Sequence, residues 1–108
     1  MNNEYEMIIC ITNNGFSEQV MEVAKEFGAK GGTVINARGT ARQEALRHFD
    51  IEITPEKEIT LILVETKIKD NILSGLYDKV GLNTPGQGIA FSLPVDDVVG
   101  LTSQIQKK

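Results

Sequence analysis

The chain has 108 residues, and its 11 Lys and Arg against 15 Asp and Glu give a net charge of −4. This length suits one domain, residues 1–108, with a single hydrophobic core. The negative balance argues against a nucleic-acid binder, because affinity for a phosphate backbone needs clustered cationic surface.

The amino end, residues 1–6, lacks the basic start and apolar stretch of a signal peptide. No apolar run approaches the roughly 20 residues of a membrane span. We therefore expect a cytoplasmic protein without membrane insertion. The single Cys10 lies in the apolar run 7–11 and is interpreted as a small buried hydrophobe, since one cysteine cannot build a disulfide framework within a chain.

The first elements in chain order are a strand and a helix. Residues 5–11 are apolar and β-branched, as in a buried strand, and Asn13–Gly15 then breaks the run. Apolar residues recur at helical spacing from Phe16 to Phe27. Ser17 is the expected N-cap of this helix, and Gly28 is its expected end.

The remaining elements are three strands and one helix. Residues 31–38 and 59–64 predict two largely apolar strands, the second of them in a nearly continuous apolar run. Apolar residues between 68 and 80 predict a second amphipathic helix. Residues 81–88 are expected to form a loop, and residues 89–93 give the last strand.

The order β-α-β-β-α-β is that of the ferredoxin-like α+β fold, in which two helices pack on one face of a four-stranded antiparallel sheet. One face of the sheet is then left uncovered. A small domain with a bare apolar face most simply hides it in a closed homo-oligomer.

Residues 39–58 form a long segment between two strands that would otherwise pair directly. A segment of this length in a small domain is typical of a functional arm, although a solvated hairpin extension is the alternative. Basic and acidic residues alternate along it, with Lys57 between Glu56 and Glu58 near its end.

Two segments with glycines at strand ends predict a small-molecule site. Glycines allow close approach of a backbone to a ligand, and arginine and glutamine side chains donate hydrogen bonds to an anion. The first segment runs from Arg38 to Gln43 and the second from Thr84 to Gly88. We interpret them as two sides of one site.

The motifs of common enzymes are missing from the sequence. No Ser stands in a G-x-S-x-G turn, and neither a phosphate-binding Walker loop nor a G-x-G-x-x-G fingerprint occurs. The expectation is therefore a protein that is not an enzyme.

At this point the sequence resembles the PII nitrogen-regulatory signal-transduction proteins over almost its whole length. The matching residues are Gly32-Thr33-Val34, Arg38-Gly39 with Arg42-Gln43, Gly86 with Gly88, and Pro94-Val95-Asp96-Asp97-Val98. The resemblance implies a homotrimer that binds adenine nucleotides in clefts between subunits. It also implies a long T-loop between strands 2 and 3 that controls a partner transporter or enzyme in nitrogen and carbon metabolism.

The resemblance also implies roles for single residues. Thr33 and Val64 would line the adenine end, Gly39 would permit close approach, and Arg42 would face phosphate. Gln43 would contact a nucleotide-bound Mg²⁺ or a nearby acid, and the turn 86–88 would offer backbone N–H groups to phosphate oxygens. The candidate effector-binding residues are Thr33, Arg38, Gly39, Arg42, Gln43, Val64, Gly86, Gln87 and Gly88.

The sequence departs from the family pattern at three cations. Ile89, Gly100 and Thr102 stand where the family pattern has a lysine and two arginines. Because the site has lost these charges, we expect an effector less charged than ATP, such as ADP, AMP or a cyclic nucleotide. The acidic neighbours of Lys57 likewise argue against sensing of 2-oxoglutarate.

Two other functions share this order of elements. The first is a trimeric ferredoxin-like module of the divalent-cation-tolerance type, which binds a metal ion or metabolite. The second is a small hydrolase of the acylphosphatase type. That chemistry needs an arginine after the first strand, and residues 13–17 contain none.

Overall fold

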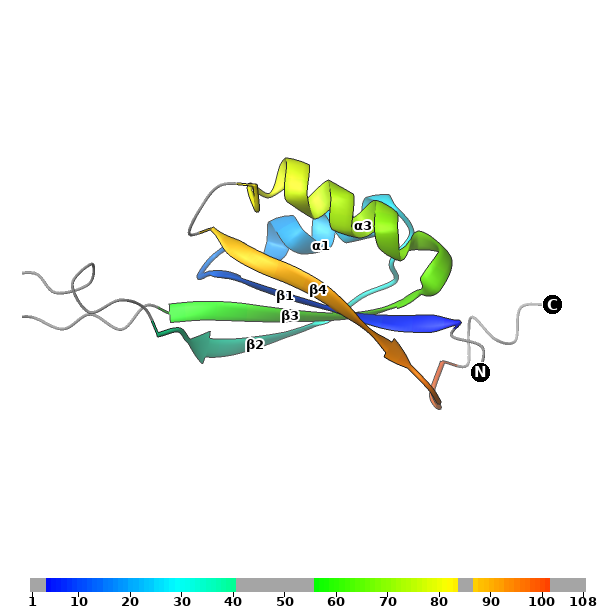
Figure 1. Cartoon of the computed structure of the whole chain (residues 1–108). Helices are drawn as coiled ribbons and strands as arrows, with labels where there is room; N and C mark the ends of the chain where they lie inside the picture. The colour runs from blue at the N-terminus through cyan, green and yellow to red at the C-terminus, as the bar shows by residue number, and fades with distance from the viewer. Residues whose placement is uncertain (1–3, 41–55, 84–86, 102–108) are drawn as a thin grey trace, which may run out of the picture.

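The elements follow the expected order in the computed structural model, which describes residues 4–40, 56–83 and 87–101. Within these residues they are β1 (Tyr5–Asn13), α1 (Ser17–Glu26), β2 (Thr33–Arg38), β3 (Glu56–Glu65), α3 (Thr66–Lys79) and β4 (Gly88–Val95) (Figure 1). The predicted βαββαβ arrangement is confirmed.

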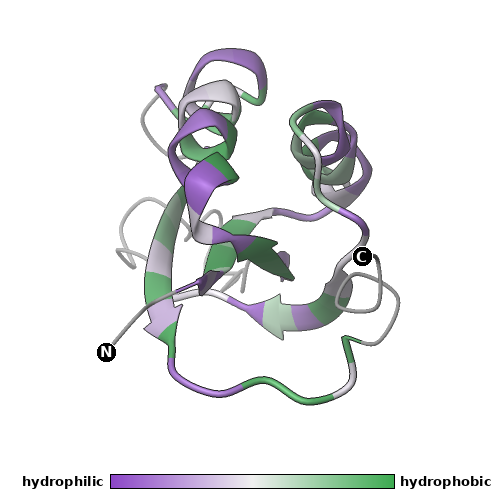
Figure 2. Cartoon of the chain, turned by 90° about the vertical axis from the view of Figure 1, so that its right-hand side faces the viewer, coloured by the Kyte–Doolittle hydropathy of each residue, from purple (hydrophilic) through white to green (hydrophobic). Residues whose placement is uncertain are grey.

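The strands form one antiparallel sheet in the order β2-β3-β1-β4. Both helices lie side by side on one face of this sheet (Figures 1 and 2). The two central strands align Ile8 with Ile62 and Ile9 with Leu61. The ferredoxin-like class expected from the sequence is therefore observed.

The hydrophobic core lies between the sheet and the helices. Alternate residues of the central strands face the helices, and Ile8, Cys10 and Ile62 are fully buried there. Burial raises the pKa of the Cys10 thiol to about 11, which keeps it protonated. The interpretation of Cys10 as a buried hydrophobe is confirmed.

The beginning of β3 differs from the prediction. The sequence predicts a strand from Ile59, but β3 begins at Glu56 and pairs there with Arg38 at the end of β2. Polar residues continue this strand because backbone pairing with two neighbours, and not apolar character, holds it. The segment between β2 and β3 is therefore residues 39–55, and we call it the arm.

The N-terminus of α1 is stabilised by a residue from a distant part of the sequence. The prediction of Ser17 as N-cap is wrong, because Phe16 holds that position and Ser17 is already helical. The backbone N–H of Ser17 instead donates to Oε1 of Glu58 at 3.0 Å. A hydrogen bond from the Ser17 hydroxyl is the main cause that lowers the pKa of Glu58, partial burial opposes it, and the N–H groups of Ser17 and Gly15 add to the lowering.

We expect Glu58→Gln to lower the urea midpoint of unfolding at pH 7, because it removes a negative charge from a helix N-terminus. A carboxylate whose pKa is lowered on folding adds stability above its unfolded-state pKa and loses this stability as the pH falls through the folded-state pKa. The two midpoints should therefore converge below the ordinary value of 4.5. Urea unfolding of both proteins from about pH 3 to about pH 7 measures how the difference between the two midpoints changes with pH.

The matched control is Glu22→Gln, because Glu22 is exposed on the same helix. This variant should unfold at nearly the same urea concentration as the wild type. A difference between Glu58→Gln and wild type that stays constant with pH would contradict the role of the Glu58 charge.

Candidate functional site

The two ends of the arm lie next to each other at one end of the sheet. Arg38 and Glu56 are register partners, and so are Ala37 and Lys57. The arm therefore leaves and re-enters the sheet on neighbouring strands (Figure 1). Its predicted effector-binding residues Arg42 and Gln43 lie outside the described residues.

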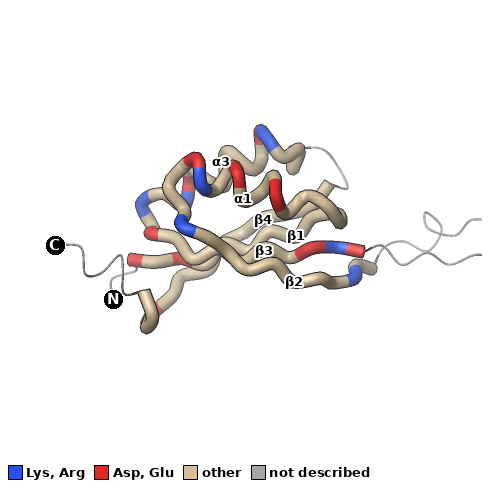
Figure 3. Tube along the Cα trace, turned by 180° about the vertical axis from the view of Figure 1, so that it is seen from behind, with Lys and Arg blue, Asp and Glu red and all other residues tan. Residues whose placement is uncertain are grey.

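Lys57 and Glu58 reach opposite faces of the sheet, because side chains alternate along a strand. Glu58 extends to the helix face and contacts Ser17, whereas Lys57 contacts Asn13 on the other face. Among the described residues, no carboxylate forms an ion pair with Lys57. Charges of both signs follow one another at this end of β3 (Figure 3), and the hydrogen-bond acceptor of the Lys57 ammonium is the neutral Asn13 amide.

A chain of hydrogen bonds joins the start of β3 to Gln87, the residue before β4. Nζ of Lys57 donates to Oδ1 of Asn13 at 2.7 Å, and Nδ2 of Asn13 donates to Oε1 of Gln87 at 3.2 Å. We call Lys57, Asn13 and Gln87 the polar row. It ends at Gln87 in the second glycine-containing segment and begins at Lys57, whose stem lies against Gly39 in the first, while their interpretation as one site stays a prediction.

Sequence reasoning missed Asn13, which was treated only as part of a turn. The available signal was alternation: Ile9, Ile11 and Asn13 share one face of β1, and Asn13 is the register partner of Lys57. The predicted residue Gly86 lies outside the described residues, next to Gln87.

Gly39 and Gly88 are both in close contact with other parts of the chain. A Cβ on Gly39 would lie 2.9 Å from Cε of Lys57, so the lysine stem crosses this glycine. A Cβ on Gly88 would lie 2.3 Å from the carbonyl oxygen of Ile11, and Gly88 has φ +153°. The absence of a side chain is thus used for internal packing, while close approach of a ligand stays a prediction.

Polar residues line a shallow pocket of about 390 Å³ at the base of the arm. Arg38 and Lys57 supply its positive charge, and Glu56 supplies a negative one. The lining residues are Asn14, Asn36, Ala37, Arg38, Glu56 and Lys57.

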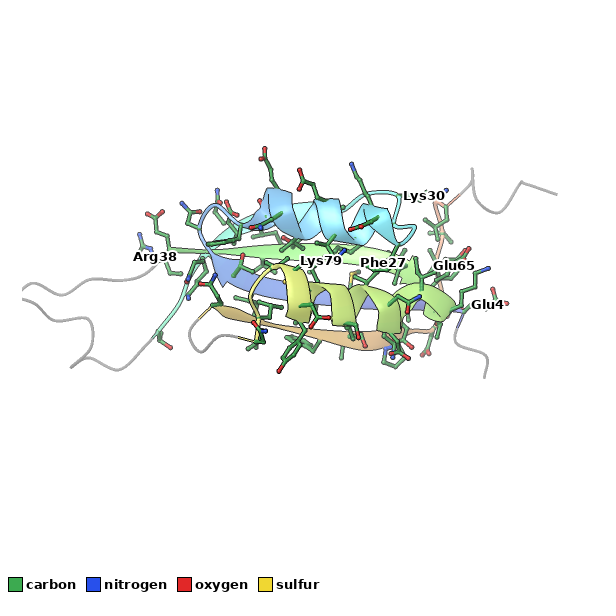
Figure 4. The ribbon with its side chains drawn as sticks, turned by 90° about the horizontal axis from the view of Figure 1, so that it is seen from above. Glu4, Phe27, Lys30, Arg38, Glu65 and Lys79 are labelled. Atoms are coloured by element: carbon green, nitrogen blue, oxygen red, sulfur yellow. The ribbon has the colours of Figure 1, made fainter. Side chains whose placement is uncertain are left out.

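The other two described candidates lie away from the arm end: Thr33 pairs with Leu61, halfway along the sheet, and Val64 lies toward the opposite end. Val64 is 3% exposed and belongs to the core, and Thr33 begins β2. Val64 also lines a mainly apolar cavity of about 370 Å³. Lys30 and Glu65, which line the same cavity, lie at one end of the molecule and Arg38 at the other (Figure 4).

The face of the sheet opposite the helices, which we call the open face, is apolar across its width. Ile35 on β2 and Ile89, Phe91 and Leu93 on β4 are between 39% and 58% exposed there. The central strands add Met7, Ile9, Ile11, Ile59, Leu61 and Leu63, all partly exposed. The polar row borders this face at the arm end.

Two of the positions that lack a family cation lie in the described part of the chain. Ile89 is 58% exposed on the open face, and Gly100 has φ +102°, whereas Thr102 lies outside it. Within residues 4–40, 56–83 and 87–101, no group of three His, Cys, Asp or Glu side chains is placed to hold a metal ion. In the same ranges, no helix is long and apolar enough to cross a membrane.

We expect Gly88→Ala to lower the free energy of unfolding by about 2 kcal/mol, because the new methyl group meets the rigid backbone of β1 and the backbone adopts a conformation that disfavours a side chain. Urea unfolding measures the change. Gly31→Ala is the control, since a Cβ on Gly31 has no atom within 4 Å and φ is ordinary there. Equal midpoints for the Gly88 and Gly31 variants would contradict the close contact.

Comparison with known proteins identifies relatives along nearly the whole chain. Residues 5–104 match the family described as nitrogen regulatory protein P-II. The fold is similar to the Bacillus subtilis GlnK–ATP complex, with a TM-score of 0.71 and 17% identity over 93% of this chain and 91% of that one.

Two further solved structures have the same fold. The PII protein of Arabidopsis thaliana bound to citrate has a TM-score of 0.67 and 22% identity, over 93% of this chain and 82% of its own. CPII from Thiomonas intermedia K12, bound to ADP, AMP and bicarbonate, has a TM-score of 0.62 and 13% identity, over 88% of this chain and 96% of its own.

Proposed function

This chain belongs to the nitrogen regulatory protein P-II family, and we propose on this premise that it is a regulator that binds an adenine nucleotide such as ADP or AMP between protomers. Binding changes the arm, which controls a partner transporter or enzyme in nitrogen or carbon metabolism. Proteins of this family are signalling regulators, and we propose no enzymatic activity. The cytoplasmic location expected from the sequence stays a prediction.

One observation carries the proposal: the base of the arm and the segment before β4 meet through the polar row. A ligand that contacts Lys57 touches a side chain that is linked through Asn13 to Gln87, next to Gly88. An effector can shift the arm only if it contacts one arm conformation better than another. The polar row places a cation where such a difference can arise.

The charges at the arm end favour a nucleotide with few phosphates. Arg38 and Lys57 are the cations that line the pocket at the base of the arm, and Glu56 opposes them. Ile89 and Gly100 add no charge. Since each surface ion pair contributes only a few kcal/mol before desolvation is subtracted, this set suits one or two phosphates better than three.

The positions of the candidates support a site shared between two protomers. Thr33 begins β2 and Gly39 directly follows the last residue of β2, so the two are six residues apart, which corresponds to about 20 Å in extended backbone. A mononucleotide does not bridge this distance along one protomer. The adenine end, with Thr33 and Val64, and the phosphate end, with Gly39, Gln87 and Gly88, therefore come from different protomers.

We expect titration calorimetry to show that ADP or AMP binds more tightly than ATP. Lys57→Met should weaken ADP binding about tenfold or more, because it keeps the lysine stem and removes a charged hydrogen-bond donor. Lys25→Met, which removes an exposed lysine of α1, is the control and should bind ADP normally. Flat heats for ADP, AMP, ATP and cyclic AMP would remove the nucleotide from the proposal.

The open face gives the protomers a reason to associate, and three copies are expected from the family. The mass in solution should be about 36 kDa, three times the 11.9 kDa chain. Phe91→Glu should give the single-chain mass in sedimentation, because it places a charge inside the apolar open face. The control Tyr77→Glu changes an exposed aromatic residue of α3 and should keep the trimer.

A wild-type chain that sediments as a monomer would contradict the shared site. So would a Phe91→Glu variant that keeps the mass of the wild type. Circular dichroism of both variants checks that the mass reflects association and not loss of folding.

A further inference from the structure

We propose that Asn13 is a positioning residue of the effector site, which couples the charge at Lys57 to the orientation of Gln87 and so to Gly88 at the start of β4. The effector half of this inference rests on the function proposed above. The coupling half rests on the polar row alone.

Asn13 occupies the middle of the polar row because β1 is a central strand. It is the last residue of β1, with β3 on one side and β4 on the other. Lys57 contacts it from β3 and Gln87 from the residue before β4. A signal that passes from Lys57 to Gln87 along these hydrogen bonds has Asn13 in its path.

The chemistry of the donors gives the polar row a direction. An ammonium group only donates hydrogen bonds, so Asn13 must turn Oδ1 toward Lys57. Its Nδ2 is then the atom that faces Gln87, and Gln87 must present Oε1 to accept. The orientation of the Gln87 amide is therefore set by the charge of Lys57, two strands away.

Lys57 is held at two points, and an anion competes for one of them. The stem of Lys57 lies across Gly39 at the start of the arm, and its ammonium group binds Asn13 at 2.7 Å. No described carboxylate neutralises it. When the ammonium moves toward an anion, Oδ1 of Asn13 loses the 2.7 Å hydrogen bond from Lys57, and the set of contacts that orients the Asn13 amide changes. Binding at Lys57 is thus reported to Gln87 and to Gly88, which follows it.

The test for coupling uses the full chain without any ligand, observed by NMR with ¹⁵N labelling. We expect Lys57→Met to shift the side-chain amide signals of Gln87 and the backbone signal of Gly88. The double variant Asn13→Leu with Lys57→Met should show the same Gln87 and Gly88 signals as the single variant Asn13→Leu. In an Asn71→Leu background, where an exposed asparagine of α3 is changed, the shift should persist.

A second variant keeps the test decisive if Asn13→Leu does not fold. Asn13→Asp retains an acceptor for Lys57 but has no donor for Gln87, so Gln87 must turn its own Nε2 toward Asp. We expect a large shift of the Gln87 side-chain amide with little change at Lys57. Signals of Gln87 and Gly88 that ignore Lys57→Met, or that respond equally without Asn13, would overturn the proposal.

A separate experiment tests the nucleotide, with ADP as the probe. With Asn13 present, the combined effect of Lys57→Met and Gln87→Leu on ADP affinity should differ from the product of their single effects by about threefold or more. In the Asn13→Leu background the two effects should be additive in free energy. Coupled NMR signals without any ADP binding would leave the role of Asn13 standing and remove the nucleotide. ADP binding without coupled NMR signals would leave the nucleotide standing and overturn the role of Asn13.

Discussion

The start of β3 holds two hydrogen bonds that join different parts of the molecule, one to the helix layer and one to the open face. Two consecutive residues there reach opposite faces of the sheet: Glu58 stabilises the N-terminus of α1, and Lys57 binds Asn13 on the open face. Strand alternation alone separates these two charges, because neighbouring side chains of a strand cannot share a face. The helix layer and the arm are thus tied to the same two residues, and a change in the strand at this point affects both.

The second constraint is the uneven covering of the sheet. Both helices lie on one face, so the apolar residues of the other face, with Phe91 at 39% and Ile89 at 58% exposed, have no cover within the described chain. Association of protomers through this face would remove it from water. It would also bring the arm end of one protomer near another protomer, and a shared effector site needs that proximity.

The order of elements could be predicted because the helical spacing and the apolar strand runs are both clear in this chain. The prediction failed at the start of β3 and at the cap of α1, where residues distant in the sequence decide the structure. Three polar residues at the start of β3 gave no strand signal, since their strand character comes from pairing with β1 and β2. The prediction of the α1 cap was wrong for the same reason, because the acceptor of the Ser17 N–H is Glu58, 41 positions away. Local patterns carry no information about such partners.

The candidate site could be predicted only in part. Glycine and arginine patterns singled out Arg38, Gly39, Gln87 and Gly88, which lie at the arm end of the sheet, and their contact with an effector stays a prediction. Asn13 could not be singled out, because an asparagine after a strand is ordinary in a turn and its value here comes from register with Lys57. The roles of Thr33 and Val64 came from the family resemblance, and their distance from the arm end became clear only from the fold.

The separation of the two ends has a thermodynamic consequence under the proposed function. An effector that contacts Val64 or Thr33 on one protomer and Lys57 on the next binds only the assembled form, so its binding free energy also favours assembly. Part of that energy is then unavailable to move the arm. A polar row that responds to the loss of one 2.7 Å hydrogen bond changes state at a cost of roughly 1.5–3 kcal/mol, the net contribution of a hydrogen bond from a charged donor. This makes Asn13 suited to report occupancy even where weak electrostatics leave the effector only modest affinity.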